Sequence, residues 1–230
     1  MSTLELDAVG KSILYFGDVH FPYQHKNFFT FIKNVINLHK PDIVVNMGDE
    51  ADFHNISMHE TDSDIELSAS GELLAVRQNC RELEQIIPEQ LLLTSNHTSL
   101  VTRRAKKFGI PTSCLKPLNE ILGVGKKWKW YDEIVADTKQ GKIYSCHGKS
   151  TAYGKLCKEM GMSCIQGHYH GKFEITWHRS ATTFRFNAFA GSFADSDRIA
   201  MAYGKNHLPK PIHGCIFVDK HGTPHMIRMR

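Results

Sequence analysis

The sequence lacks the features that mark several classes of protein. No apolar run approaches the roughly 20 residues that a membrane-spanning helix needs. The first residues show no basic segment followed by a long apolar stretch, so we expect no secretory signal. Internal repeats, linkers and low-complexity segments are also missing. We therefore expect one domain over residues 1–230 and no association with a membrane.

Cysteine pairs are missing as well. The six cysteines are dispersed without a Cys-x-x-Cys pair, in a chain of 230 residues that is long enough to bury a large core. A scaffold that depends on disulfides is thereby excluded. Dispersed cysteines of this kind are typical of reduced thiols, and we expect a cytoplasmic location.

The excess of positive over negative charge is also small, because the formal net charge is +4 and the isoelectric point is about 8.7. This balance favours anionic partners only slightly. Basic residues cluster at 103–107 and at 126–130, and the chain has 14 histidines, which is many for its length. Where the histidines lie is therefore more informative than the net charge.

The apolar pattern predicts a chain that alternates between strands and helices up to about residue 170. Beyond that point, strict alternation of apolar and polar residues indicates antiparallel strands, which we expect to form a meander behind the α/β part. Residues 111–137 are broken by Pro and Gly, and one or two antiparallel strands are expected near 128–135. The predicted strands are 12–16, 43–47, 90–94, 142–146, 163–166, 172–177, 183–189, 214–219 and 225–229, and the predicted helices are 25–39, 71–87, 100–108, 117–122 and 151–160.

Polar residues follow five of these strands directly. The first two strands and the helix between them should form a right-handed βαβ unit, which places the loops after both strands at one edge of the sheet. The third strand should deliver its loop to the same edge. The five segments are Gly17-Asp18-Val19-His20, Gly48-Asp49-Glu50-Ala51-Asp52, Asn96-His97, His147-Gly148 and Gly167-His168-Tyr169-His170.

In order and spacing, these five segments resemble the signature of the calcineurin-like metallophosphoesterases, over about residues 13–170. The resemblance implies an α/β fold, a four-layer α/β/β/α sandwich of two mixed β-sheets. It also implies a hydrolase that acts on phosphoesters.

The candidate ligands are carboxylates, imidazoles and one carboxamide, without a thiolate, a mixture that suits hard or borderline divalent ions. Seven ligands exceed what one four-coordinate ion needs but suit two ions. Mn²⁺ is our first choice, with Fe, Zn, Co and Mg as alternatives. The resemblance assigns Asp18, His20 and His170 to the first ion, Asn96, His147 and His168 to the second, and Asp49 to both, with a metal-bridging hydroxide that attacks phosphorus.

The resemblance gives His97 the role of protonating the leaving oxygen or of stabilising the charge that develops on the phosphate. Here the sequence departs from the family. An acid commonly follows the histidine in the family, whereas Thr98 occupies that position in this chain. The missing acid would normally orient the imidazole. We expect Asp52 to take over this orienting role, or the role to be weakened, and a helix-cap or supporting position for Asp52 is an equal alternative.

The substrate is less well defined by the sequence. The segments 202–206 and 210–214 resemble compact phage-encoded members of the family, which would place the protein in the host cytoplasm. Such members are commonly linked with nucleotides, so we predict a phosphomonoesterase that acts on nucleotides, similar to a 5′-nucleotidase. The alternatives are a DNA endonuclease or exonuclease of the same superfamily and, from another class, a catalytically weakened protein that binds metal and nucleic acid.

Three further segments have two interpretations each. The tryptophans Trp128 and Trp130 could stack on bases, but we favour the edge of the core. The polar segment 50–66 could carry additional ligands, but we favour a solvated connector or lid. The basic stretch 103–107 is interpreted as an exposed helix face, with a track for phosphates as the alternative.

Overall fold

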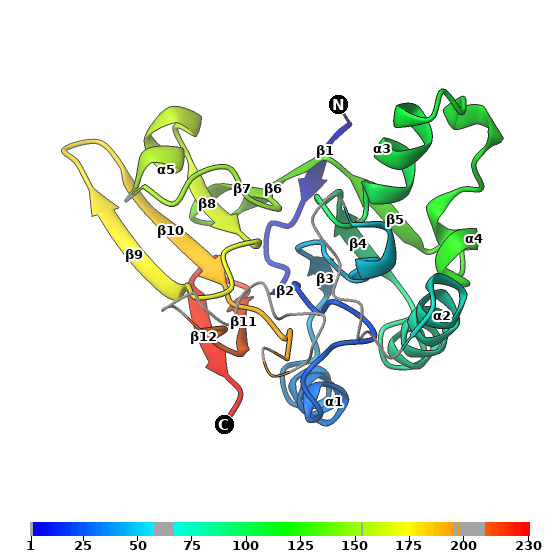
Figure 1. Cartoon of the computed structure of the whole chain (residues 1–230). Helices are drawn as coiled ribbons and strands as arrows, with labels where there is room; N and C mark the ends of the chain where they lie inside the picture. The colour runs from blue at the N-terminus through cyan, green and yellow to red at the C-terminus, as the bar shows by residue number, and fades with distance from the viewer. Residues whose placement is uncertain (1, 58–66, 153, 196, 198–209) are drawn as a thin grey trace.

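The computed structural model describes residues 2–57, 67–152, 154–195, 197 and 210–230. Within them the chain forms two six-stranded mixed sheets with helices on their outer faces (Figure 1). The apolar residues separate into one cluster between the sheets and one outside each sheet. The predicted four-layer α/β/β/α sandwich is therefore confirmed.

The first sheet has the strand order β12-β11-β2-β3-β4-β5. Its parallel part comprises β2 (Ile13–Phe16), β3 (Ile43–Asn46), β4 (Gln90–Leu93) and β5 (Trp128–Tyr131). Strand β11 (Gly214–Val218) pairs antiparallel with β2, and β12 (Pro224–Arg228) pairs antiparallel with β11 at the edge. The helices α1 (Phe28–His39) and α2 (Ala69–Ile86) bury their apolar faces in the cluster on its outer side, because both have apolar residues at helical spacing.

The second sheet has the order β1-β6-β7-β8-β10-β9. It comprises β1 (Thr3–Asp7), β6 (Glu133–Thr138), β7 (Gly141–Cys146), β8 (Ser163–Gln166), β10 (Phe184–Ala190) and β9 (Phe173–Arg179). The short helix α5 (Lys155–Met160) covers its outer face, where three cysteines are buried. Between the two sheets, side chains from β2 and β3 meet side chains from β6, β7 and β8, among them Tyr15, Met47, Ile134 and Ile165.

The remaining helical segments are short. They are η1 (His54–Ile56), α3 (Leu100–Lys107), η2 (Thr112–Cys114) and α4 (Leu118–Leu122). Of these, α3 follows directly on the loop after β4. Among the described residues, no helix has both the length and the apolar character needed to cross a bilayer.

Three features of the fold differ from the prediction. Strand β5 pairs parallel with β4, whereas antiparallel strands were expected there. The C-terminal strands do not form one meander, because the β9–β10 hairpin joins the second sheet and the β11–β12 hairpin joins the first. Strand β1 was not predicted. Pairing partners far apart in the sequence decide each of these features, and local periodicity carries no information about such partners.

The tryptophans belong to the core and its edge, as we favoured. Trp128 is 2% exposed, and its Nε1 donates a hydrogen bond to the carbonyl oxygen of Ile87 at 3.1 Å. Trp130 is partly buried and donates to the carboxylate of Glu50 at 2.9 Å. The Trp128 ring is therefore too buried to stack on a base.

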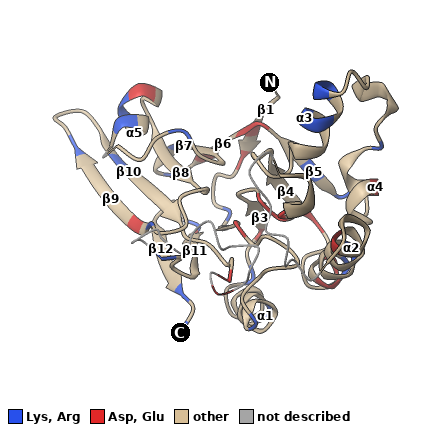
Figure 2. Cartoon of the chain, in the orientation of Figure 1, with Lys and Arg blue, Asp and Glu red and all other residues tan. Residues whose placement is uncertain are grey.

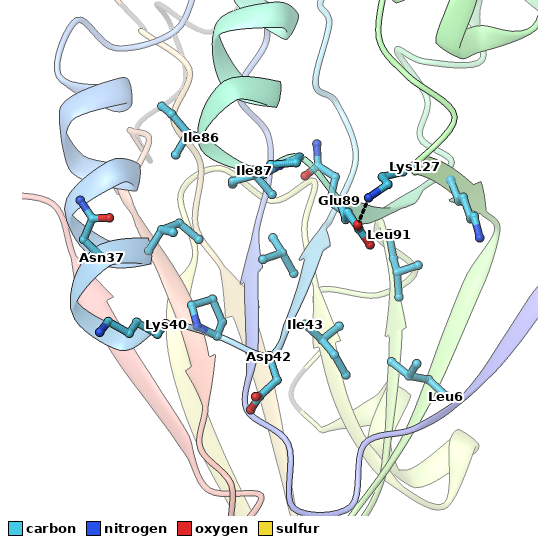
Figure 3. A pocket seen from close by; sticks show the side chains of 16 residues that line it. Leu6, Asn37, Lys40, Asp42, Ile43, Ile86, Ile87, Glu89, Leu91 and Lys127 are labelled. Carbon is cyan, nitrogen blue, oxygen red and sulfur yellow. Dashed lines mark hydrogen bonds and ion pairs between the residues drawn. The ribbon is translucent and has the colours of Figure 1, made fainter.

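A cavity of about 690 Å³ lies at the amino ends of β3 and β4. Apolar side chains such as Ile43, Ile86 and Leu91 line it, and Lys40, Asp42, Glu89 and Lys127 stand among them (Figure 3). None of the seven predicted metal ligands lines this cavity. The chemistry that the sequence predicts lies at the opposite end of these strands.

Candidate metal centre

The predicted ligands come together where β2, β3, β4, β7 and β8 end. Each strand stops and its next residues turn across the same edge, because parallel strands present their carboxyl ends together. Three groups of side chains have potential ligand atoms within 4.8 Å of one another: one is His20, Asp52 and His97, and the other two contain the predicted ligands. The first of these two is Asp18, His20, Asp49 and His170, and the second is Asp49, His147 and His168.

The first group is compact and mostly buried. The Nε2 atoms of His20 and His170 lie 3.1 Å apart, and Nε2 of His170 lies 3.2 Å from Oδ1 of Asp18. Asp18 and His20 are fully buried, and the side chain of His170 is 23% exposed. Nitrogen and carboxylate lone pairs thus converge on a small volume, an arrangement that suits a divalent cation.

The second group is more open. Nε2 of His147 lies 3.1 Å from Oδ2 of Asp49 and 2.8 Å from Oδ1 of Asn96. Nδ1 of His147 donates to the carbonyl oxygen of Met47 at 2.7 Å, which leaves Nε2 free to offer its lone pair. His168 is exposed and its ring lies against that of His147.

Asp49 belongs to both of these groups, which is the position that the family resemblance implies for it. Its carboxylate lies 3.5 Å from Nε2 of His20 on one side and 3.1 Å from Nε2 of His147 on the other. The donors present, namely carboxylates, imidazoles and a carboxamide oxygen, fit divalent metal ions.

The backbone at these residues is held in an uncommon conformation. Asp18, His20, Asp49 and His168 all have positive φ angles between 52° and 70°. Such left-handed conformations cost non-glycine residues about 1–3 kcal/mol each and concentrate at functional sites. At Gly167 any side chain would collide with the site, because a Cβ atom would lie 2.7 Å from Oδ2 of Asp18.

Hydrogen bonds from other loops hold the strained segment around Asp18. The backbone N–H of His168 donates to both carboxylate oxygens of Asp18, at 2.9 and 3.0 Å. Ser192 Oγ and the N–H of Phe193 both donate to the carbonyl oxygen of Asp18, each at 2.9 Å. The loop after β10 thus supports the first group, a contact that the sequence did not reveal.

Asp52 connects His20 and His97. Its Oδ1 accepts from Nδ1 of His20 at 2.6 Å and lies 3.3 Å from Nδ1 of His97, whose shorter contact is with the carbonyl oxygen of Asp52 at 2.5 Å. A carbonyl oxygen only accepts hydrogen bonds, so Nδ1 of His97 carries a proton. Asp52 therefore orients both rings, mainly through its carboxylate for His20 and through its backbone for His97.

Thr98, which replaces the family's acid, is also connected to a carboxylate. Its hydroxyl donates to Oε2 of Glu50 at 3.1 Å and lies 2.6 Å from Oγ of Ser95, which in turn accepts from the N–H of Asp49 at 3.0 Å. Glu50 is fully buried, and burial raises the pKa of its carboxyl. Sequence reasoning missed Glu50, although its place beside Asp49 in a loop after a strand was a signal.

Charges within the centre shift the titration of its members. Burial opposes protonation of His147, yet the charge of Asp49 and its hydrogen bond to the ring raise the pKa of His147 to about 9. Burial would raise the pKa of Asp49, but the histidine charges hold it well below its usual range. Burial lowers the pKa of His20 and of His168. A cation that binds near Asp49 must therefore displace a proton from His147.

A small pocket of about 290 Å³ opens beside the second group. Its lining includes Asn96, His147 and His168, together with Asp132 and Lys149. Of the polar segment 50–66, residues 58–66 lie outside the described residues, as does the segment 202–206. His54 is placed, and its Nδ1 lies 3.7 Å from Oδ2 of Asp52.

No protein-family model and no curated protein matches the sequence. Among solved structures, the chain is similar to an archaeal phosphodiesterase, with 14% identity and a TM-score of 0.49 over 95% of this chain and 99% of that one. It is also similar to vacuolar protein sorting 29 from Cryptosporidium parvum, with 14% identity and a TM-score of 0.48 over 96% and 92%. For YfcE, a phosphoesterase from E. coli, the identity is 9% and the TM-score 0.45, over 95% and 100%. Because these likenesses are low, the fold and the site rest on strand order and side-chain geometry.

Proposed function

We propose that this protein is a metal-dependent phosphoester hydrolase with a dinuclear centre. The observation that carries the proposal is the position of Asp49, whose carboxylate contacts both ligand groups. Asp18, His20 and His170 would hold one ion, and Asn96, His147 and His168 the other. Two such ions, when bound, position a phosphoester, activate water and neutralise charge on the oxygens of the reaction.

The protein's own residues supply orientation and a proton. Because Nδ1 of His97 is held by the carbonyl oxygen of Asp52, Nε2 is the ring atom available to a substrate. In the imidazolium form, His97 donates from Nε2 to the leaving oxygen, and the Asp52 carboxylate at 3.3 Å stabilises its positive charge. The N–H of His97 also donates to Oδ1 of Asp49 at 3.1 Å, which fixes the proton donor relative to the shared ligand.

For the substrate we propose a phosphomonoester of a nucleotide. The pocket beside Asn96, His147 and His168 supports this choice, because it offers room for a leaving group next to the second ligand group. Hydrolysis of an internal phosphodiester in DNA is the second candidate, supported by the basic helix α3 that follows Asn96. A catalytically weakened binding protein is disfavoured, because every predicted ligand stands in the cluster and Glu50 supplies a carboxylate beside Thr98.

A substrate panel tests the proposal. Protein supplied with Mn²⁺ is offered nitrophenyl phosphate, bis-nitrophenyl phosphate, nucleoside 5′-monophosphates, and single-stranded and double-stranded DNA. We expect phosphate release from the monoesters, and a loss of about 10²-fold or more in kcat for His97→Ala. Thr112→Ala, in an exposed turn away from the centre, is the matched control. If no phosphoester is turned over by protein that demonstrably binds the metal, the proposed function is wrong.

A further inference from the structure

Helix α3 presents a basic face. Its sequence, Leu-Val-Thr-Arg-Arg-Ala-Lys-Lys, contains no acidic residue, and in Figure 2 it is coloured blue without red. Arg103, Lys106 and Lys107 are exposed. Within the described part of the chain, none of the three has a carboxylate partner. A surface with several unpaired cations attracts polyanions.

This face is attached rigidly to the candidate metal centre. The guanidinium of Arg103 donates to the carbonyl oxygen of Asn96 at 2.6 Å, and Ser99 Oγ donates to the same oxygen at 3.1 Å. One nitrogen of Arg103 is used in this way, whereas the guanidinium carries five N–H donors and the residue is exposed. This cation is therefore fixed beside Asn96 and still able to contact a phosphate.

Arg104, the next residue, shows the contrast. Its side chain turns inward and donates to the carbonyl oxygens of Ile56 and Ser57, so it ties α3 to η1. These hydrogen bonds fix the orientation of α3 about its own axis. Arg103 and Lys107, which are one turn apart, are thereby left on the outer surface.

An exposed aromatic ring follows directly. Phe108 ends α3 and is 72% exposed, and Ile110 beyond it is 46% exposed. A large apolar ring at the end of a basic helix has no role in the core. Cations that follow a backbone, together with an aromatic ring on which a base can stack, are the combination with which proteins bind single-stranded nucleic acid.

We propose that α3 and Phe108 bind a single-stranded nucleic acid, with phosphates on Arg103, Lys106 and Lys107 and one base on Phe108. This inference rests on the proposed function, because the strand would then carry its reacting phosphoester to the ions beside Asn96. A free nucleotide that fills the metal centre lacks the further phosphates that would reach Lys106 and Lys107. A strand with a terminal nucleotide phosphomonoester is therefore the preferred substrate over a free mononucleotide.

Binding is tested first without turnover. Fluorescence anisotropy with a labelled single-stranded oligonucleotide is measured on metal-depleted full-length protein over a range of salt concentrations. For Lys106→Glu/Lys107→Glu we expect affinity to fall about tenfold or more at low salt, and the slope of log K against log salt to decrease by roughly 1.4, or 0.7 for each lost phosphate contact. For Phe108→Ala we expect affinity to fall about tenfold with the slope unchanged.

Matched controls remove the same chemistry from other surfaces. Lys33→Glu/Lys158→Glu removes two lysines far from α3, and Leu38→Ala removes a side chain that is 77% exposed on α1. Thermal unfolding of each variant verifies that it is folded. If the α3 variants bind the strand no worse than these controls, the inference is wrong. Equal losses for blunt duplex DNA in Phe108→Ala would also overturn it, because a paired base cannot stack on the ring.

Turnover then separates this inference from the proposed function. With metal-loaded protein, the ratio of kcat/KM for a 5′-phosphorylated oligonucleotide to that for nitrophenyl phosphate should fall about tenfold in both α3 variants. An unchanged ratio overturns the inference but leaves the hydrolase intact. If wild-type protein binds the strand with the expected salt dependence but hydrolyses no phosphoester, the proposed function fails while the binding face stands.

Discussion

The two ends of the same parallel strands differ in nearly every physical respect. At the carboxyl ends of β2, β3 and β8 lie carboxylates and imidazoles, with positive φ angles at four candidate ligand residues. At the amino ends of β3 and β4 lies a cavity of about 690 Å³ walled mainly by apolar side chains. This cavity thus does not contain the candidate metal ligands. Strand direction, rather than cavity size, locates the candidate site.

The reason is that the two ends receive different parts of the chain. Each parallel strand leads at its carboxyl end into a loop that can bring in a polar residue, and several such loops converge. The amino ends receive the ends of α1 and α2 instead, which bring apolar residues such as Ile36 and Ile86. Gln90 shows the cost of a polar group there, because it is 3% exposed and its amide has no hydrogen-bond partner.

The largest effect is expected from Asp49→Asn at the carboxyl end. Removing the charge shared by both ligand groups should release at least one ion and lower kcat by roughly a hundredfold or more, because even residues that only support ligands are worth about 10–100-fold. Elemental analysis of dialysed protein and turnover of nitrophenyl phosphate measure the two effects. Full activity and metal content would show that Asp49 does not bridge.

The next prediction compares the two ligand groups at the carboxyl ends of the strands. His170→Ala should empty the buried group around Asp18 and His20, whereas His168→Ala should weaken only the more open group around His147. Metal titration by calorimetry should then find one ion in each variant, bound more tightly in His168→Ala. If either change removes both ions to the same degree, the assignment of His170 and His168 to different ions is wrong.

A smaller effect is expected at Glu50, which supports the loop that carries Asn96 and Thr98. Glu50→Ala leaves the buried hydroxyl of Thr98 and Nε1 of Trp130 without their acceptor, and should lower the free energy of unfolding by about 1–3 kcal/mol. Glu50→Gln retains an acceptor oxygen and should lose less. Denaturant unfolding of both variants gives the difference. Equal stability of the two would mean that the hydrogen bonds do not matter.

The smallest effect belongs to Asp42 at the amino end. Its carboxylate accepts from the N–H and the hydroxyl of Ser12, each at 2.8 Å, and these hydrogen bonds lower the pKa of Asp42. The ionised group therefore stabilises the fold above its unfolded pKa of about 4, and this contribution disappears as pH falls through the lower folded value. Asp42→Asn should be slightly less stable than wild type at pH 7.

The difference between wild type and Asp42→Asn should shrink below about pH 4, where the wild-type carboxyl gains its proton. Because Asp42 is exposed, the effect is reduced by solvent screening. Turnover and metal content should match wild type. A gap in unfolding free energy that widens in acid would contradict the assignment.

Much of this architecture could be predicted because its signals are local. The apolar runs at 13–16, 43–46 and 90–93 end at polar residues, so both the strands and the loops that carry Asp18, Asp49 and Asn96 could be read directly. Helices such as α1 were found by their apolar spacing. The parallel pairing of β5 with β4 was not found, because the local sequence of a four-residue strand fits either direction.

By itself, the sequence determined which residues are available for the chemistry and at which strand ends they stand, since periodicity and spacing are properties of neighbouring residues. Only the tertiary structure decided what supports them. It placed the Asp52 carbonyl on His97, the Glu50 carboxylate on Thr98 and the Ser192 hydroxyl on the carbonyl oxygen of Asp18. These contacts join segments 45 to 174 residues apart, and such distances are closed by packing rather than by local preference.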